Sequence, residues 1–246
     1  MKSSQDTTEL HQKLERDGFA FVVSDTMRKL LDGPESLVDW KAFVASWNDL
    51  ATDTYLAATG RQRRRRHAIY QIDADGVVQR TRQQPHYQSL QNNPLQGNMQ
   101  RWFMPIRPVL ADGPSMRCIL GFCRKFFGEL APNVDNWHVE AHQFRIEASA
   151  DKAGEPTPEG IHRDGVDYVL VLLIDRLNIE RGTTTTHSHD GALLGSFTLT
   201  HALDAALVDD NHVLHGVTAV IPLDPAQPAH RDVLVVTFRH TEPGAA

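Results

Sequence analysis

The chain has 246 residues, of which 41% are hydrophobic and 23% are charged, and its formal net charge is −6 at pH 7. This composition is ordinary for a globular protein with a substantial core, and the acidic balance argues against a dedicated nucleic-acid binder. The sequence contains no run of about 18 apolar residues, so no membrane-spanning helix is predicted. Its first residues lack the apolar segment of a secretory signal. We therefore expect a cytoplasmic protein with neither a membrane nor a nucleic acid as partner, and we expect reduced thiols at Cys118 and Cys123.

The first 135 residues mix helical and strand patterns. Apolar residues recur at helical spacing in three segments that we predict to be helices: 7–17, 36–51 and 115–130. Short strands are predicted at 19–23 and on both sides of a turn at 73–76, and the segment 83–106 is polar and rich in turn residues.

An arginine run, Arg61-Gln62-Arg63-Arg64-Arg65-Arg66, leads into the strand that precedes the turn at 73–76. Such a run is often a solvated face, or a patch for nucleic acid or for localisation. Because alternate side chains of a strand point to one side, two or three of these arginines could instead line a cleft that accepts carboxylates. The sequence leaves the role of the run open among these alternatives.

Strand patterns dominate after residue 136. Alternating or β-branched segments separated by turn residues occur at 138–148, 166–174, 182–186, 193–200, 211–223 and 232–239. This arrangement favours a two-sheet jelly roll with flanking helices, a mostly β fold. We expect a single domain, 1–246, in which residues 1–135 pack on a core of jelly-roll strands in 136–241.

A histidine and an aspartate stand two residues apart in the stretch Glu159-Gly160-Ile161-His162-Arg163-Asp164-Gly165. In extended chain both side chains would project from one face, at the mouth of the apolar strand predicted at 166–174. One more histidine from a facing strand would complete a 2-His-1-carboxylate facial triad, which is typical of non-haem Fe(II) oxygenases.

Several histidines compete to be the third ligand. His212 and His215 are three residues apart, so in a strand they point to opposite faces and only one can enter the site. His215 is favoured because it begins an apolar strand, and His212 stays the alternative. His187 and His189 lie in a polar, turn-like stretch and are expected to be exposed loop residues.

The last predicted strand carries an arginine near its start. Arg231 precedes the apolar run 232–238, and burying its charge unpaired would be costly. Its fork of donors fits a carboxylate, so it could hold one end of a dicarboxylic cosubstrate whose other end binds the metal. Arg239, on the same alternating face, is the alternative.

Four motifs occur in order at 156–165, 176–179, 215–218 and 231–234, with weaker ones at 86–89 and 93–95. Together they resemble the bacterial 2-oxoglutarate/Fe(II)-dependent dioxygenase family typified by L-isoleucine dioxygenase. The resemblance covers about residues 60 to 240. One departure is Arg181-Gly182-Thr183-Thr184, where the family tends to show a Gly-Gly-Glu-Thr-like turn, so a different substrate pocket is expected.

The resemblance implies a double-stranded β-helix (a cupin-like jelly roll), Fe(II) held by His162, Asp164 and His215, and 2-oxoglutarate and O2 as cosubstrates. It implies hydroxylation of an unactivated C–H bond of a free L-amino acid or close derivative, or sulfoxidation of a thioether one, with conversion of 2-oxoglutarate to succinate and CO2. Arg231 matches the arginine that would hold the distal carboxylate of 2-oxoglutarate.

For the amino acid itself, we look to Arg145, with Gln143 beside it, to bind the carboxylate, and to Glu159 to bind the ammonium group. Three other functions remain open: a cupin-like zinc or manganese hydrolase or isomerase, a non-catalytic jelly-roll binding protein, and an oxygenase that acts on nucleic acid through the arginine run. A homodimer is compatible with all of them.

Overall fold

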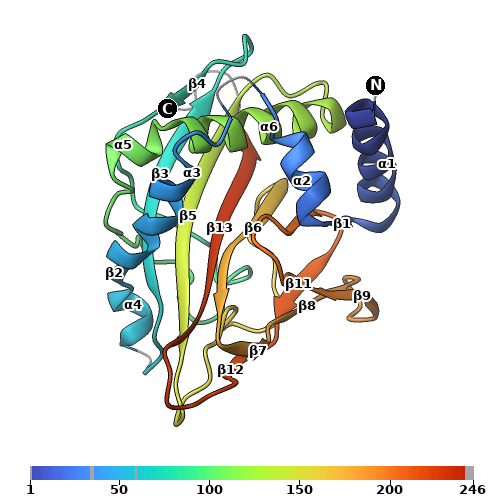
Figure 1. The fold of residues 1–246 in the computed structure, drawn as a ribbon. Coiled ribbons are helices and arrows are strands. Elements are labelled where there is room, and N and C mark those ends of the chain that lie inside the picture. The colour runs from blue at the N-terminus through green and yellow to red at the C-terminus, as the bar shows by residue number, and fades with distance from the viewer. Residues whose placement is uncertain (1, 34–35, 59, 242–246) are drawn as a thin grey trace.

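The computed structural model describes residues 2–33, 36–58 and 60–241, and its largest element is one antiparallel sheet (Figure 1). The strands follow the order β1-β10-β6-β13-β5-β3-β2, and β4 pairs with β3. Their bounds are Phe19–Val22 (β1), Ala51–Thr52 (β2), Arg64–Ile72 (β3), Val78–Arg80 (β4), Trp137–Ala148 (β5), Tyr168–Leu177 (β6), Ala205–Asp209 (β10) and Ala229–His240 (β13). The sheet therefore joins strands from both halves of the chain.

Two smaller antiparallel sheets complete the β structure. One has the order β11-β8-β9 and the other pairs β12 with β7. Their bounds are Ile179–Arg181 (β7), Thr183–His187 (β8), Leu193–Thr198 (β9), Leu214–Val217 (β11) and Val220–Pro222 (β12). The protein is thus mostly β with a jelly-roll core, as the sequence predicted.

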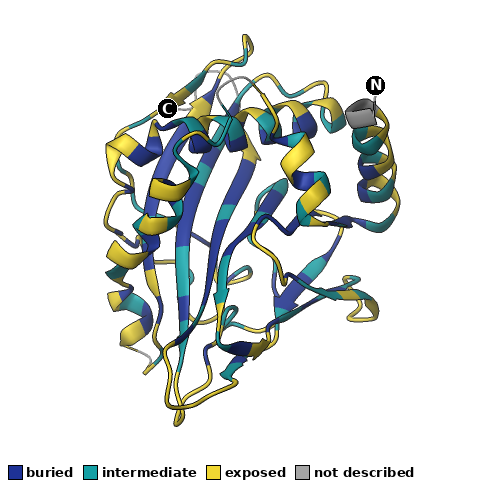
Figure 2. Cartoon of the chain, in the orientation of Figure 1, coloured by how far each residue is buried: buried dark blue, intermediate teal, exposed yellow. Residues whose placement is uncertain are grey.

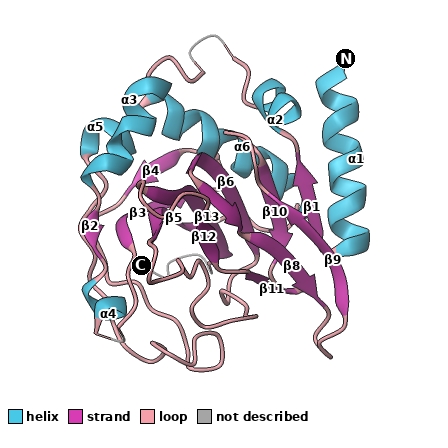
Figure 3. Cartoon of the chain, turned by 60° about the horizontal axis from the view of Figure 1, so that its bottom comes forward, coloured by secondary structure: helices cyan, strands magenta, loops and turns pink. Residues whose placement is uncertain are grey.

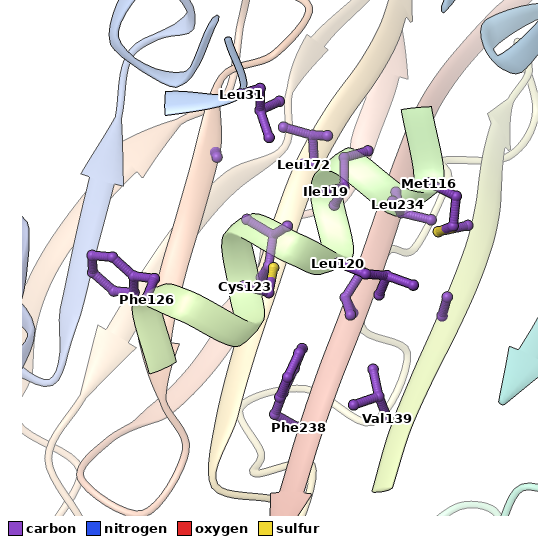
Figure 4. Close-up of a cluster of buried hydrophobic side chains, with 14 of the residues drawn as sticks. Leu31, Met116, Ile119, Leu120, Cys123, Phe126, Val139, Leu172, Leu234 and Phe238 are labelled. Carbon is purple, nitrogen blue, oxygen red and sulfur yellow. The ribbon is translucent and has the colours of Figure 1, made fainter. Parts of the chain in front are cut away.

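Helices cover one side of the large sheet, and the long loops lie on the other side (Figure 3). Their bounds are Lys2–Asp17 (α1), Ser24–Leu30 (α2), Trp40–Ala45 (α3), Thr54–Ala57 (α4), Pro108–Ala111 (α5) and Pro114–Leu130 (α6), with a 3-10 turn at Ser46–Asp49. The longest, α6, presents Ile119, Leu120 and Cys123 to the sheet, where they meet Leu234 and other apolar residues (Figure 4).

Strict alternation along the central strands separates two faces of the sheet. On β13, Leu234, Val236 and Phe238 join the core beneath α6, whereas Val233 and Val235 line a cavity on the opposite side. The strands are accordingly buried along most of their length, while the outer faces of the helices are exposed (Figure 2). Each central strand therefore stabilises the fold with one set of side chains and builds the cavity with the other.

Some predicted elements have different bounds. The helix expected at 36–51 begins only at Trp40 and ends in the 3-10 turn, because Leu37 has a left-handed backbone (φ 56°) that a helix cannot include. The strands β7 and β10 were not expected. Both cysteines are free thiols, as predicted. Among the helices described, none has the length and apolar character to span a membrane.

Candidate active site

The main candidate site is a cavity of about 280 Å³ on the side of the large sheet away from the helices. The wall combines side chains from β3, β5, β6 and β13 with the loops at 84–101 and 156–166 and with His215 on β11. It includes both the predicted metal ligands and Arg231.

The two histidines of the predicted triad face each other across an isolated antiparallel bridge. Each backbone N–H, of His162 and of His215, donates to the carbonyl of the other residue at 2.9 Å. Side chains directly opposite in such a pair share a face, and the two ring centroids lie 4.7 Å apart. The backbone pairing therefore brings together two residues that are far apart in the sequence.

Asp164 joins them on the same side. Its carboxylate oxygens lie 3.7 Å from His162 Nε2 and 3.4 Å from His215 Nε2. Cis ligands of a metal ion at about 2.1 Å would be about 3 Å apart, so small adjustments of these side chains suffice to surround an ion. The three residues form one of the groups in the described chain with ligand atoms all within 4.8 Å. His212, by contrast, is exposed.

The donor set suits a divalent ion. His162 Nδ1 donates to the Gly160 carbonyl at 3.0 Å, which leaves its Nε2 lone pair facing Asp164. His215 Nε2 is buried and has no hydrogen-bond partner among the described residues. Despite burial, which lowers it, the pKa of His215 is raised to about 10 by Asp164 and Asp210. A cation is therefore favoured at this point, and a metal ion would supply that charge in place of the proton.

The turn that carries Asp164 is held by a buried carboxylate. Asp210 accepts the backbone N–H groups of Asp164, Gly165 and Val166 at 2.9, 2.7 and 3.1 Å. Gly165 has a φ of +81°, and a Cβ there would lie 1.9 Å from the Asn92 amide nitrogen, so a larger residue would clash. The sequence reasoning did not single out Asp210, although its position just before β11 placed it near the site.

Arg231 is buried against the same cavity without a counter-charge. It is 2% exposed, and its Nε and Nη2 lack hydrogen-bond partners in the described part of the chain. Burial, together with the nearby charge of Arg176, lowers the pKa of Arg231 to about 10. A buried unpaired guanidinium is costly, and a ligand carboxylate would satisfy its free donors. Arg239 also lines the cavity but is exposed.

The arginine run divides by alternation between cavity and surface. Arg63 and Arg65 are buried and line the cavity, whereas Arg64 is exposed. Arg65 stacks on the Phe103 ring, 3.5 Å from its centroid. Arg101, from the long loop, is a third buried arginine in the wall and donates to Gln88, whose amide nitrogen lies 3.4 Å from Asp164. Two arginines of the run, Arg63 and Arg65, therefore line a cleft, as one of the alternatives predicted, and Arg64 lies on the surface.

The cavity wall also holds a second cluster, which the sequence reasoning missed. Glu140 on β5 is contacted by four imidazoles, at 2.9 Å from His67, 2.7 Å from His86, 3.2 Å from His138 and 3.2 Å from His142. Three of its members are alternate residues of β5. That period-2 pattern was visible in the sequence, but the opposite face of the strand was assigned to the site.

Of the three residues predicted to bind the amino acid, two lie outside the cavity and one lines it. Gln143 and Arg145 lie on the face of β5 that is turned away from the cavity, where Gln143 donates to Ser46 and Arg145 pairs with Asp232 at 2.6 Å. The structure does not bring these two residues to the site. Glu159 does line the cavity, with its carboxylate 3.3 Å from His162 Nε2.

An antiparallel jelly roll with two histidines, an aspartate and an uncompensated buried arginine around one cavity describes the class of non-haem iron oxygenases that use a 2-oxo acid. Residues 44–237 match the family described as 2OG-Fe dioxygenase, and the chain belongs to that family. It is therefore a dioxygenase whose cofactor is Fe(II) and whose cosubstrates are 2-oxoglutarate and O2. This assignment excludes two functions that the sequence left open, a zinc or manganese hydrolase or isomerase and a non-catalytic binding protein.

Three known proteins resemble this chain in sequence or in fold. The chain is 23% identical over 238 residues to 3(1)-hydroxy-L-isoleucine 4-dioxygenase of Pantoea ananatis, covering 93% of this chain and 94% of that one. Its fold is similar to that of a bsmA homolog from Methylobium petroleophilum PM1, with a TM-score of 0.84, 35% identity and coverage of 95% and 93% of the two chains. IDO from Bacillus thuringiensis is similar in fold, with a TM-score of 0.78, 18% identity and coverage of 96% and 100%.

Proposed function

We propose that this dioxygenase hydroxylates an unactivated C–H bond of a free L-amino acid or a close derivative. In this proposal His162, Asp164 and His215 hold Fe(II), and Arg231 binds the distal carboxylate of 2-oxoglutarate. The observation that carries it is the pairing, within one cavity of about 280 Å³, of the three converging ligands with a buried arginine that has free donors.

The character of the cavity supports a small zwitterionic substrate. Its walls carry charges of both signs, with Arg101 and Glu140 among the buried or nearly buried groups. Arg101 Nε has no partner in the described chain, and its other nitrogens donate to the neutral amides of Gln96 and Gln88. A substrate carboxylate would meet a cation with spare hydrogen-bonding capacity there. The Pantoea ananatis relative, by its name, acts on a hydroxylated isoleucine.

When bound with 2-oxoglutarate and O2, the iron supplies the oxidation, in which one oxygen atom enters the substrate C–H bond and the 2-oxo acid becomes succinate and CO2. The protein orients the reactants. His162 is held by the Gly160 carbonyl, Asp164 by the turn that Asp210 closes, and Arg231 by the packing of β13 between β5 and β6. The apolar residues Val233 and Val235 help to exclude water from the cavity.

The test is succinate release from 2-oxoglutarate in the presence of Fe(II) and ascorbate, with each of the twenty amino acids and mass spectrometry for a product 16 Da heavier. His162→Ala and Asp164→Ala are expected to abolish turnover and leave the folded circular-dichroism spectrum unchanged, because neither side chain belongs to the apolar core. His212→Ala, an exposed histidine close to His215 in the sequence, is the matched control and should retain activity. Absence of product with every amino acid and small derivative would refute the substrate class.

A further inference from the structure

The cluster around Glu140 is built to keep a carboxylate ionised within the substrate cavity. Its side chain is 13% exposed and receives contacts from His67, His86, His138 and His142. These imidazoles hold the pKa of Glu140 well below its usual range, although burial acts in the opposite direction. A buried carboxylate with so many donors is a fixed negative charge in the wall.

Hydrogen-bond directions show that two histidines of this cluster, His142 and His67, are donors to Glu140 and not metal ligands. Arg65 Nη2 lies 2.7 Å from His142 Nδ1, and because a guanidinium can only donate, that nitrogen carries no hydrogen. The proton of neutral His142 is therefore on Nε2, which points at Glu140. Burial lowers the pKa of His142 well below its usual value, so the ring stays neutral.

The same reasoning applies to His67. The amide nitrogen of Gln83 donates to the Phe103 carbonyl at 3.1 Å, which fixes the orientation of the amide. It lies 3.1 Å from His67 Nδ1, so that nitrogen accepts and Nε2 carries the hydrogen that faces Glu140 at 2.9 Å. A metal ion would need bare Nε2 atoms from both rings. This is the reverse of His162, whose Nδ1 donates to the Gly160 carbonyl, so that the neutral ring presents its Nε2 lone pair toward Asp164.

One side of Glu140 remains available to a ligand. Three of the four imidazoles contact Oε2, and only His138 contacts Oε1, at 3.2 Å. A carboxylate oxygen accepts more than one hydrogen bond, so Oε1 can receive another donor from the cavity. The donors that already surround it carry no positive charge of their own when neutral, and an ammonium group would complete an ion pair.

The place of Glu140 along the sheet suits the substrate rather than the 2-oxo acid. Glu140 is opposite Thr237 on β13, whereas Arg231 is opposite Ile146. Six residues therefore separate the two positions, about 20 Å at 3.3 Å per residue. Such a length accommodates the keto acid at the Arg231 end and a second small molecule at the other. Asp164 is linked through Gln88 to Arg101, the buried arginine with spare donors for a substrate carboxylate.

We propose that Glu140, held by its four histidines, binds the α-ammonium group of the amino-acid substrate and selects amino acids against analogues that lack the amine. This inference rests on the proposed function and names the group of the substrate that the site recognises. It replaces Glu159 in that role.

The experiment uses calorimetry on the protein loaded with Mn(II) and 2-oxoglutarate, so that binding is measured without turnover. The probes are L-isoleucine, L-leucine, L-methionine and any amino acid that gives product in the screen above, each compared with its 2-hydroxy acid. Wild-type protein is expected to bind the amino acid about 100-fold more tightly than the hydroxy acid, the size of one lost charged hydrogen bond with its partner left buried. Glu140→Gln should remove this difference and leave the affinity for 2-oxoglutarate unchanged.

Two variants serve as comparisons. Glu147→Gln changes a carboxylate on the outward face of the same strand and should retain the discrimination, whereas Glu159→Gln tests the competing carboxylate of the cavity. If wild-type protein binds the hydroxy acids as tightly as the amino acids, the inference is overturned even if Glu140→Gln fails to fold. It is also overturned if Glu159→Gln alone removes the difference, or if the protein takes up two Mn(II) ions per chain with the second lost in His142→Ala. Failure of every amino acid to bind or react, with intact 2-oxoglutarate binding, would refute the proposed function as well.

Discussion

Arg231 shows how a single residue can be unfavourable for folding and useful for binding. Its guanidinium is buried, its Nε and Nη2 are unpartnered within the described chain, and the neighbouring Arg176 adds a like charge. Such a group lowers the stability of the ligand-free protein, and a bound carboxylate would offset that loss. The cost is typical of sites at which a protein retains a strained or unpaired group for function.

We predict that Arg231→Met raises the KM for 2-oxoglutarate about 100-fold or more while leaving the melting temperature of the ligand-free protein equal or higher. The first effect follows from the loss of charge-assisted hydrogen bonds, and the second from the removal of an unpaired buried charge. Steady-state kinetics and thermal unfolding with and without 2-oxoglutarate measure both. Arg239→Met, the exposed arginine on the same face, is the control, and an unchanged KM in Arg231→Met would transfer the role to Arg239.

At the same scale, the candidate residues that the sequence could select are those marked by local patterns. His162 and Asp164 are two residues apart, and Arg231 begins an apolar strand, so chemistry and spacing were enough to select them. Glu140 was missed because its partners come from β3, β5 and the long loop at 81–107. Their meeting depends on strand register and loop path, which no short window of sequence contains.

Among the elements, the turn between the His162–His215 bridge and β6 carries Asp164, and its shape depends on one buried carboxylate. Its three consecutive backbone N–H groups converge on both oxygens of Asp210, which is fully buried. Backbone donors that are buried must find acceptors, and here one carboxylate satisfies three. The position of Asp164 therefore depends on a residue that arrives 46 positions later in the chain.

We predict that Asp210→Asn lowers the free energy of unfolding by about 1–3 kcal/mol and weakens Mn(II) binding, because an amide oxygen replaces only one of the two acceptors and its NH2 group faces a backbone donor. Urea unfolding and calorimetry measure the two effects. Asp224→Asn, in which the carboxylate caps the exposed turn at Ala226, should change neither property. Unaltered Mn(II) affinity in Asp210→Asn would separate the turn from the metal site.

Periodicity predicted the types of the elements, but it did not predict which face of each strand would line the cavity. In β5 the alternation was correctly recognised, yet Gln143 and Arg145 were assigned to the site although they face the helical side. A period of two gives two faces and does not say which one a helix will cover. That choice is made by the packing of α6 and its neighbours on Val139 and Ala141.

For the whole molecule, the large sheet separates stability from chemistry. Residues from both halves of the chain contribute to one sheet, in which β3 from the first half pairs with β5 and β1 pairs with β10. The apolar core lies between this sheet and the helices, and the cavity lies on its other side. The division into an N-terminal part at 1–135 and a core at 136–241 stays a prediction, and the strand order places segments of both within the same layer.

We predict that Leu120→Ala, on the sheet-facing side of α6, destabilises the protein by about 2–5 kcal/mol and leaves the KM for 2-oxoglutarate and the amino acid within about twofold of wild type at a temperature where the variant is folded. Leu120 is fully buried in the core cluster and absent from the cavity wall. Lys125→Ala, on the exposed side of the same helix, should alter neither quantity. A large rise in either KM would mean that the two faces of the sheet are mechanically coupled.

The arginine run has a consequence for how insertions and deletions in β3 would be tolerated. If one residue were deleted ahead of the strand, its register would shift by one, and Arg64 and Arg66 would occupy the inward positions of Arg63 and Arg65. The cavity would therefore keep its arginine lining. It would not keep the imidazole of His67, because the residues beside it, Arg66 and Ala68, cannot replace its contact with Glu140. In this strand the arginines can replace one another, whereas His67 and the core-facing residues Ala68, Tyr70 and Ile72 specify the native register.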